Sequence, residues 1–90
     1  MIRVIWSDKF VNRYKKWARR HSDLTNIFED KILLFSKEPF HPSLKTHSLR
    51  GKLKDVWSMS INYEHRLTFR FEENNTKAIL INIGAHDEVY

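Results

Sequence analysis

The sequence contains no cysteine, which excludes a disulfide-stapled scaffold, a thiolate nucleophile and a Cys-ligated zinc site. It has only two glycines and two prolines, which argues against low complexity or a long flexible linker. The longest unbroken apolar runs have four residues, whereas a membrane span needs about 20, so we expect none. The N-terminal segment also lacks the long apolar stretch of a secretory signal, so the expected compartment is the cytoplasm.

The remaining composition is typical of a small folded protein with excess positive charge. A chain of 90 residues with 41% hydrophobic residues has room for one core, so we expect a single domain over residues 1–90. Sixteen basic and eleven acidic residues give a net charge of +5. Residues 1–37 carry nine basic and four acidic groups, and residues 38–55 carry four basic and two acidic groups. Residues 56–90 carry three basic and five acidic groups, so the positive charge belongs to the first half and the middle of the chain. This charge favours a polyanionic partner, and a basic face kept for solubility is the alternative.

The first half of the chain predicts a short strand and two helices. Residues 2–6 are β-prone, and Ser7 and Asp8 can cap an amphipathic helix of about residues 8–20. A second apolar stripe predicts a helix over about residues 23–37, which the following prolines stop. Two helices separated by about three residues are expected to form an antiparallel hairpin.

The second half predicts a loop followed by three strands. Residues 38–55 show no periodic pattern of apolar residues, which predicts a loop. A loop of this length is often functional, and the alternative is a simple crossover from helix to sheet. From residue 56 the period becomes two, as in half-buried strands with tight connections. The alternating apolar side chains are Trp57, Met59, Ile61 and Tyr63, then Leu67, Phe69 and Phe71, then Ile79, Ile81 and Ile83. The fold expected is α+β with the order β-α-α-β-β-β: two layers, with the helix hairpin packed on the apolar face of a twisted, mainly antiparallel sheet.

Three groups of residues could carry chemistry, and the first is a basic string in the loop. It combines His47 with four cations, Lys45, Arg50, Lys52 and Lys54. Such a string is suited to contacts with phosphates, and an ordinary solvated loop is the alternative.

The second group is at the entry to the middle strand. Alternation places Glu64, Arg66 and Arg70 on the face opposite the apolar side chains, and turns His65 toward the apolar side. An arginine on a sheet face without a helix over it is available to an oxyanion, since its guanidinium donors suit phosphate. The alternative is a cross-strand salt bridge with Glu64 or Glu72.

The third group is the tail, in which His86 follows directly after the last strand. A histidine at this place suits proton transfer near neutral pH, although a surface histidine beside two acids is the commoner situation. If loop, strand entry and tail converge, they form a cationic pocket that also includes Tyr90. This composition suits RNA cleavage without a metal or other cofactor, with the substrate's 2′-hydroxyl as the nucleophile. The protein would supply a base, an acid and a cation for the developing charge.

The whole chain resembles the RelE/ParE superfamily of toxins from bacterial type II toxin–antitoxin systems. The start of the chain at residues 5–7 and the strand motif at residues 62–69 (NYEHRLTF) are similar to YoeB-type members. The loop motif at residues 47–51 (HSLRG) and the tail at residues 83–90 (IGAHDEVY) are more similar to YafQ-type members. The four motifs occur in the family's order without large gaps.

The resemblance implies a ribosome-dependent mRNA interferase that acts in the ribosomal A site, with a cognate antitoxin, the ribosome and mRNA as partners and no membrane association. A homodimer, or a toxin–antitoxin complex that binds operator DNA, is a further expectation. Arg66 falls on the family's strand arginine and His86 on its tail histidine, the general acid. Tyr90 matches the terminal aromatic residue, and the resemblance leaves His47 and Glu64 as the two candidates for the base. A ParE-like protein that inhibits DNA gyrase without cutting RNA is the alternative.

Overall fold

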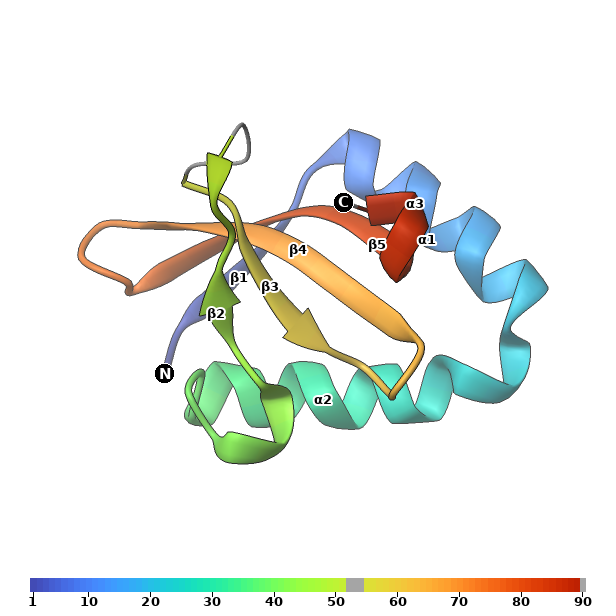
Figure 1. Cartoon of the computed structure of the whole chain (residues 1–90), viewed down its shortest axis with the longest axis horizontal. Helices are drawn as coiled ribbons and strands as arrows, with labels where there is room; N and C mark the ends of the chain where they lie inside the picture. The colour runs from blue at the N-terminus through green and yellow to red at the C-terminus, as the bar shows by residue number, and fades with distance from the viewer. Residues whose placement is uncertain (52–54, 90) are drawn as a thin grey trace.

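A computed structural model describes residues 1–51 and 55–89 of the chain, with two long helices over one face of a five-stranded sheet (Figure 1). The helices, with two short 3₁₀ helices η1 and η2, are α1 (Asp8–Arg20), η1 (Ser22–Leu24), α2 (Thr25–Lys37), η2 (Pro42–Leu44) and α3 (His86–Val89). The strands are β1 (Arg3–Trp6), β2 (His47–Ser48), β3 (Trp57–Ser60), β4 (His65–Glu72) and β5 (Lys77–Ala85). None of the helices in this part of the chain is long and apolar enough to cross a membrane.

The sheet is mixed, with the strand order β1-β5-β4-β3-β2. β3, β4 and β5 form the predicted antiparallel meander, and β1 pairs with β5 in parallel. The α+β fold class and the order of the main elements are therefore confirmed. Four short elements were not predicted: the 3₁₀ helices η1 and η2, the strand β2, which pairs with β3 inside the expected loop, and α3 in the tail. Each has four residues or fewer, too few for a periodic pattern to appear in the sequence.

α1 begins and ends where the sequence predicts. The Ser7 hydroxyl accepts a hydrogen bond from the Phe10 amide at 3.2 Å, which satisfies one of the free donors of the first turn. Phe10 and Trp17, seven residues apart on one face, are buried. α2 begins at Thr25, slightly later than predicted, because the preceding three residues form η1.

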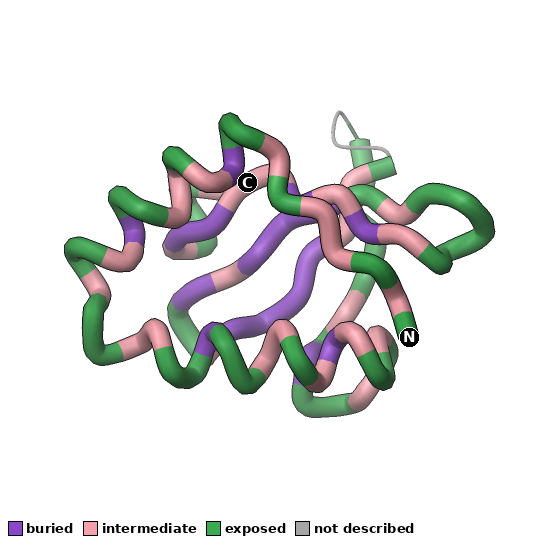
Figure 2. Tube along the Cα trace, turned by 180° about the vertical axis from the view of Figure 1, so that it is seen from behind, coloured by how far each residue is buried: buried purple, intermediate pink, exposed green. Residues whose placement is uncertain are grey.

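The two helices meet at η1 and diverge from it, so the hairpin is open (Figures 1 and 2). Contact near their junction is aromatic: the Tyr14 and Phe28 ring centroids are 4.8 Å apart. The core lies between the helices and the sheet, where Figure 2 shows buried stretches along the strands. Its buried hydrophobic members are Phe10, Trp17, Phe28, Phe35, Leu44, Met59, Ile61, Leu67, Phe69, Ala78, Leu80 and Ile83.

A β-bulge in β5 changes which of its residues face the core. The register with β4 passes from Thr68–Asn82 to Phe69–Leu80 and leaves Ile81 without a partner. The buried apolar residues of β5 are Ala78, Leu80 and Ile83. The prediction that the isoleucines at 79, 81 and 83 share the buried face is therefore wrong, because the extra residue reverses the alternation.

The predicted strand before β4 is also too long. β3 ends at Ser60, and the following four residues form the connection to β4. Tyr63 consequently lies in a turn with 87% of its surface exposed, and it is not part of the apolar face.

Candidate active site

The pairing of the strands places His47 and Arg66 on the same face of the sheet, the face away from the core. His47 pairs with Ser58, which pairs with Thr68 of β4. Arg66 lies two residues before Thr68, and alternation therefore gives its side chain the same direction. The loop histidine and the strand arginine are thus brought to one side of the sheet, as the sequence predicts.

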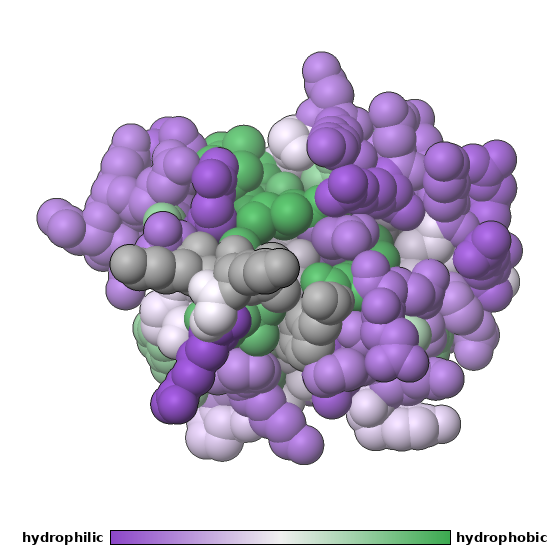
Figure 3. Space-filling model, turned by 45° about the horizontal axis from the view of Figure 1, so that its top comes forward, coloured by the Kyte–Doolittle hydropathy of each residue, from purple (hydrophilic) through white to green (hydrophobic). Residues whose placement is uncertain are grey.

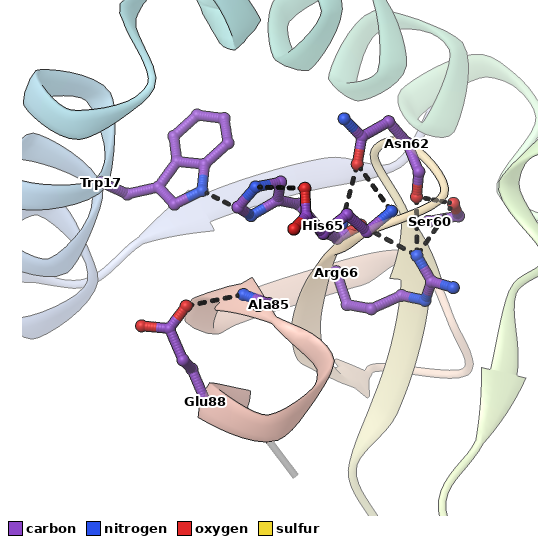
Figure 4. Close-up of polar contacts among 8 residues, drawn as sticks. Trp17, Ser60, Asn62, His65, Arg66, Ala85 and Glu88 are labelled. Carbon is purple, nitrogen blue, oxygen red and sulfur yellow. Dashed lines mark hydrogen bonds and ion pairs between the residues drawn. The ribbon is translucent and has the colours of Figure 1, made fainter.

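The Arg66 guanidinium is held by the turn between β3 and β4 (Figure 4). Its Nη1 donates to the carbonyl oxygen of Asn62 at 2.6 Å and to that of His65 at 3.1 Å. A third contact, to the Ser60 hydroxyl, is longer at 3.4 Å. Among residues 1–51 and 55–89, no carboxylate forms a salt bridge with Arg66. The guanidinium is therefore oriented by neutral acceptors and keeps an unneutralised positive charge.

Asn62 organises this turn through both its side chain and its backbone. Its Oδ1 accepts from the amides of Glu64 at 3.0 Å and His65 at 2.7 Å. Its carbonyl oxygen accepts from the Ser60 hydroxyl at 2.8 Å in addition to Arg66. A short asparagine side chain that bonds to the following amides is a common device of tight turns. Asn62 thus couples the shape of the turn to the position of Arg66.

His65 is a structural residue on the opposite face of β4, as its place in the alternation predicts. It is 3% exposed, and its Nδ1 accepts from Trp17 Nε1 at 3.1 Å, while its ring centroid is 4.4 Å from that of His21. An indole nitrogen only donates, so Nδ1 carries no proton and the ring is neutral, protonated at Nε2. Burial, followed by the proximity of His21, lowers the pKa of His65 below its ordinary value.

The position of Glu64 differs from the prediction that it shares the face of Arg66. Glu64 lies in the turn before β4, where strict alternation does not hold. Its carboxylate is 3.8 Å from His65 Nε2, on the core side of the sheet, and its side chain is 60% exposed. The structure therefore separates Glu64 from the Arg66 side chain.

The tail bends back over the end of the sheet, close to Arg66. Gly84 of β5 pairs with Arg66, and α3 begins two residues later with His86, which is exposed. The Glu88 carboxylate accepts from the Ala85 amide at 3.0 Å, and this bond closes the first turn of α3. A side chain at Gly84 would place its Cβ 3.3 Å from the Cβ of Glu88, so glycine permits this close approach.

His47 has a defined tautomer when its ring is neutral. Its Nδ1 donates to the Lys45 carbonyl oxygen at 2.8 Å, and a carbonyl oxygen only accepts. The proton therefore lies on Nδ1, and Nε2 keeps the lone pair that a general base needs. The side chain is exposed.

The predicted RNA-binding residues are scattered around these groups. Lys45 and Arg50 are exposed on either side of β2, and Arg70 is exposed on the same face of β4 as Arg66. The remaining predicted site residues, Lys52, Lys54 and Tyr90, lie outside the described residues. No group of three His, Asp or Glu side chains in the described part of the chain is arranged to hold a metal ion.

Asn62 and Trp17, which support the site through hydrogen bonds, were not predicted from the sequence. Asn62 had a usable signal, because asparagine in a short segment between two strands is typical of a turn. Trp17 had none: its spacing on α1 indicates a core residue, and nothing in the sequence shows that its indole bonds to His65.

Comparison with known proteins identifies the family. A family model described as the bacterial toxin of the type II toxin–antitoxin system, YafQ, matches residues 2–90. The chain belongs to this family. YafQ-family membership implies an antitoxin partner. No curated protein sequence is significantly similar to the chain.

Solved structures of YafQ- and YoeB-type toxins have the same fold. YafQ from E. coli strain BL21(DE3) matches with a TM-score of 0.80 and 16% identity, covering 100% of this chain and 99% of that one. A metal-bound toxin from Helicobacter pylori matches with a TM-score of 0.78 and 24% identity over 100% of both chains. A YoeB dimer from Staphylococcus aureus matches with a TM-score of 0.71 and 16% identity, covering 94% of this chain and 97% of that one.

Proposed function

We propose that this YafQ-family toxin is an endoribonuclease that cleaves translated mRNA on the ribosome. The observation that carries the proposal is the Arg66 guanidinium, which is oriented by three neutral acceptors and paired with no carboxylate of the described residues. An oriented, unneutralised guanidinium on a sheet face suits a phosphodiester, because its donors match the phosphate oxygens.

The reaction uses the RNA's own 2′-hydroxyl as the nucleophile. The 2′-oxygen attacks the adjacent phosphorus, the bond from phosphorus to the 5′-oxygen breaks, and a 2′,3′-cyclic phosphate and a 5′-hydroxyl result. A base takes the 2′-proton and an acid protonates the leaving 5′-oxygen. Arg66 stabilises the negative charge that develops on the non-bridging oxygens.

Two histidines supply the acid and the base in this proposal. His86 is the acid, since α3 places it two residues beyond the partner of Arg66. His47 is favoured over Glu64 as the base, because its Nε2 has a free lone pair on the Arg66 face while the Glu64 carboxylate lies beside His65. Tyr90, which lies outside the described residues, is proposed as a further catalytic residue on the resemblance of the tail motif alone.

The basic residues around the site hold the RNA backbone. Lys45, Arg50 and Arg70 are exposed, and Arg70 shares the face of Arg66. Lys52 and Lys54 belong to the same stretch of sequence as the first two. Contacts from such cations position the strand without reading its sequence.

The proposal is tested with Arg66→Ala and a matched control, Arg3→Ala, in a purified translation system. Arg3 is exposed and paired with Glu73 at the far end of the sheet, so its variant removes the same charge away from the site. Loss of one donor to a developing oxyanion typically costs about 10²–10³ in rate, so single-turnover cleavage should fall by this factor for Arg66→Ala alone. Equal cleavage by the two variants, or an intact message with the wild type, contradicts the proposal. An intact message combined with inhibited DNA gyrase would support the ParE-like alternative.

The roles of the other residues are separated by three glutamine variants. His86→Gln and His47→Gln should each lower cleavage by roughly 10²–10⁴, the usual contribution of an acid or base. Glu64→Gln should leave cleavage nearly unchanged, because its carboxylate is on the core side of the turn. The reverse order for His47 and Glu64 would assign the base to the glutamate.

A further inference from the structure

A basic groove lies between α1, the end of β5 and α3. Its cavity volume is about 400 Å³. The residues that line it are Arg13, Lys16, Trp17, Arg19, Arg20, His21, Asn82, Ile83 and Glu88. In Figure 3 hydrophilic side chains cover the right-hand side of the molecule, where α1 runs in Figure 1.

The groove has a large excess of positive charge. Its four cations occupy α1 positions 13, 16, 19 and 20, and at 1.5 Å per residue they extend over about 10 Å of the helix. None of them forms a salt bridge with another described residue. Arg13 Nη1 donates to the Ile81 carbonyl oxygen at 2.9 Å, which fixes one wall of the groove. Among the described residues that line the groove, only Glu88 carries a carboxylate.

The lining favours a phosphate backbone over a protein partner. Interfaces between proteins depend on apolar or aromatic side chains that become buried on binding. The two large apolar residues of the groove, Trp17 and Ile83, are already 5% and 6% exposed, so they offer little further area to bury. Three of the four cations are arginines, whose planar forks match phosphate oxygens.

The groove also borders the helix that carries the proposed acid. Glu88, one of its lining residues, belongs to α3, the helix that begins with His86. An RNA strand that passes His86 and follows α3 would therefore reach α1.

We propose that this groove binds the phosphodiester backbone of single-stranded RNA outside the bond that is cleaved. The inference rests on the proposed function for the choice of RNA as the polyanion, but it concerns binding alone. The Lys16 and Arg20 side chains are exposed and contact phosphates directly, whereas Arg13 shapes the wall next to β5.

The test measures binding of a 12-nucleotide 2′-O-methyl oligouridylate by fluorescence anisotropy. This probe lacks the 2′-hydroxyl nucleophile, so its binding does not depend on whether the protein cleaves RNA. The groove variant is Lys16→Gln with Arg20→Gln. The control is Lys9→Gln with Lys15→Gln, which changes the charge of α1 equally at two exposed residues outside the groove.

The expected loss follows from counterion release. On a single strand, the logarithm of the binding constant falls by about 0.7 per phosphate contact for each tenfold increase in salt concentration. Each contact therefore contributes about fivefold to the affinity at 0.1 M salt. The groove variant should bind about 25-fold more weakly, with a salt slope shallower by about 1.4, while the control changes by less than threefold. Equal losses in both variants, or no loss in the groove variant, would overturn the proposal.

A competing acidic peptide distinguishes the two kinds of partner. If a 12-residue polyglutamate binds the wild type as tightly as the RNA does, and loses affinity in the same groove variant, the groove is a protein-binding site and the RNA assignment is wrong. Weak peptide binding that is equal in both variants supports RNA. If the wild-type protein binds the probe normally but cleaves no message, the proposed nuclease function is wrong and the proposed RNA-binding groove stands.

Discussion

Trp17→Phe is expected to destabilise the protein by about 3 kcal/mol. The indole N–H donates to the buried Nδ1 of His65 at 3.1 Å, and Trp17 itself is 5% exposed. A buried acceptor left without its donor costs about 1–3 kcal/mol. The smaller phenyl ring also leaves a void of at least a methyl group, which costs about 1 kcal/mol more.

The measurement is urea and thermal unfolding followed by circular dichroism, with Trp6→Phe as the control. Trp6 is 38% exposed and packs against Phe10, Tyr14 and Phe28 without a side-chain hydrogen bond among the described residues. For a domain of this size, 1 kcal/mol corresponds to about 4–8 °C, so Trp17→Phe should lower the Tm by roughly 12–24 °C. The control should lose less than about 1 kcal/mol.

The two variants together isolate the hydrogen bond, because both replace an indole by a phenyl ring. If Trp17→Phe costs no more than Trp6→Phe, the bond to His65 contributes nothing and the reasoning is refuted. A large loss that persists when His65 is changed to Phe would assign the effect to packing alone, since the acceptor is then absent.

Two further predictions concern pH and the tail. Because the pKa of His65 is lower in the folded state, the unfolded chain binds more protons below about pH 6.5, and the free energy of unfolding should fall as the pH drops below that value and be constant just above it. Urea midpoints measured between pH 7.5 and 5 test this. If the dependence of the midpoint on pH is the same in His65→Gln, His65 is not its cause. Gly84→Ala should cost about 1–3 kcal/mol, and it should lower cleavage by more than this loss of stability explains, because the new Cβ displaces Glu88 and with it α3. A loss of cleavage that matches the loss of stability would show that α3 does not position the site.

The sequence predicted the helices and the order of strands because these depend on local signals. The Ser7 cap and the apolar spacing of α1 lie within a few residues of the element that they define. The bulge at Ile81 depends instead on how β5 pairs with a strand far away in the sequence. The run from Ala78 to Ile81 is apolar throughout, so its composition does not distinguish the two faces.

In the candidate site too, local patterns predicted side-chain directions only within a regular strand. Arg66 was assigned to the correct face because it lies within a regular strand, where alternation holds. Glu64 is only two residues earlier, but it belongs to the turn that Asn62 shapes, and there its direction depends on hydrogen bonds to the turn amides. Strand ends are therefore where alternation fails, and the candidate site is built on such an end.

The five histidines of the chain have separable roles when exposure and nitrogen partners are considered together. His65 is buried and neutral against Trp17, and His21 packs on its ring. His41 accepts the Ser43 amide at 3.1 Å and caps η2. His65 and His41 each accept a hydrogen bond at Nδ1, which a proton on that nitrogen would break, and His21 packs on the His65 ring, on the opposite face of β4 from Arg66. Of the remaining two, His47 lies on the Arg66 face and His86 at the end of the strand paired with it. His47 and His86 are therefore the histidines that we propose as the base and the acid, because of their places relative to the strand that carries Arg66.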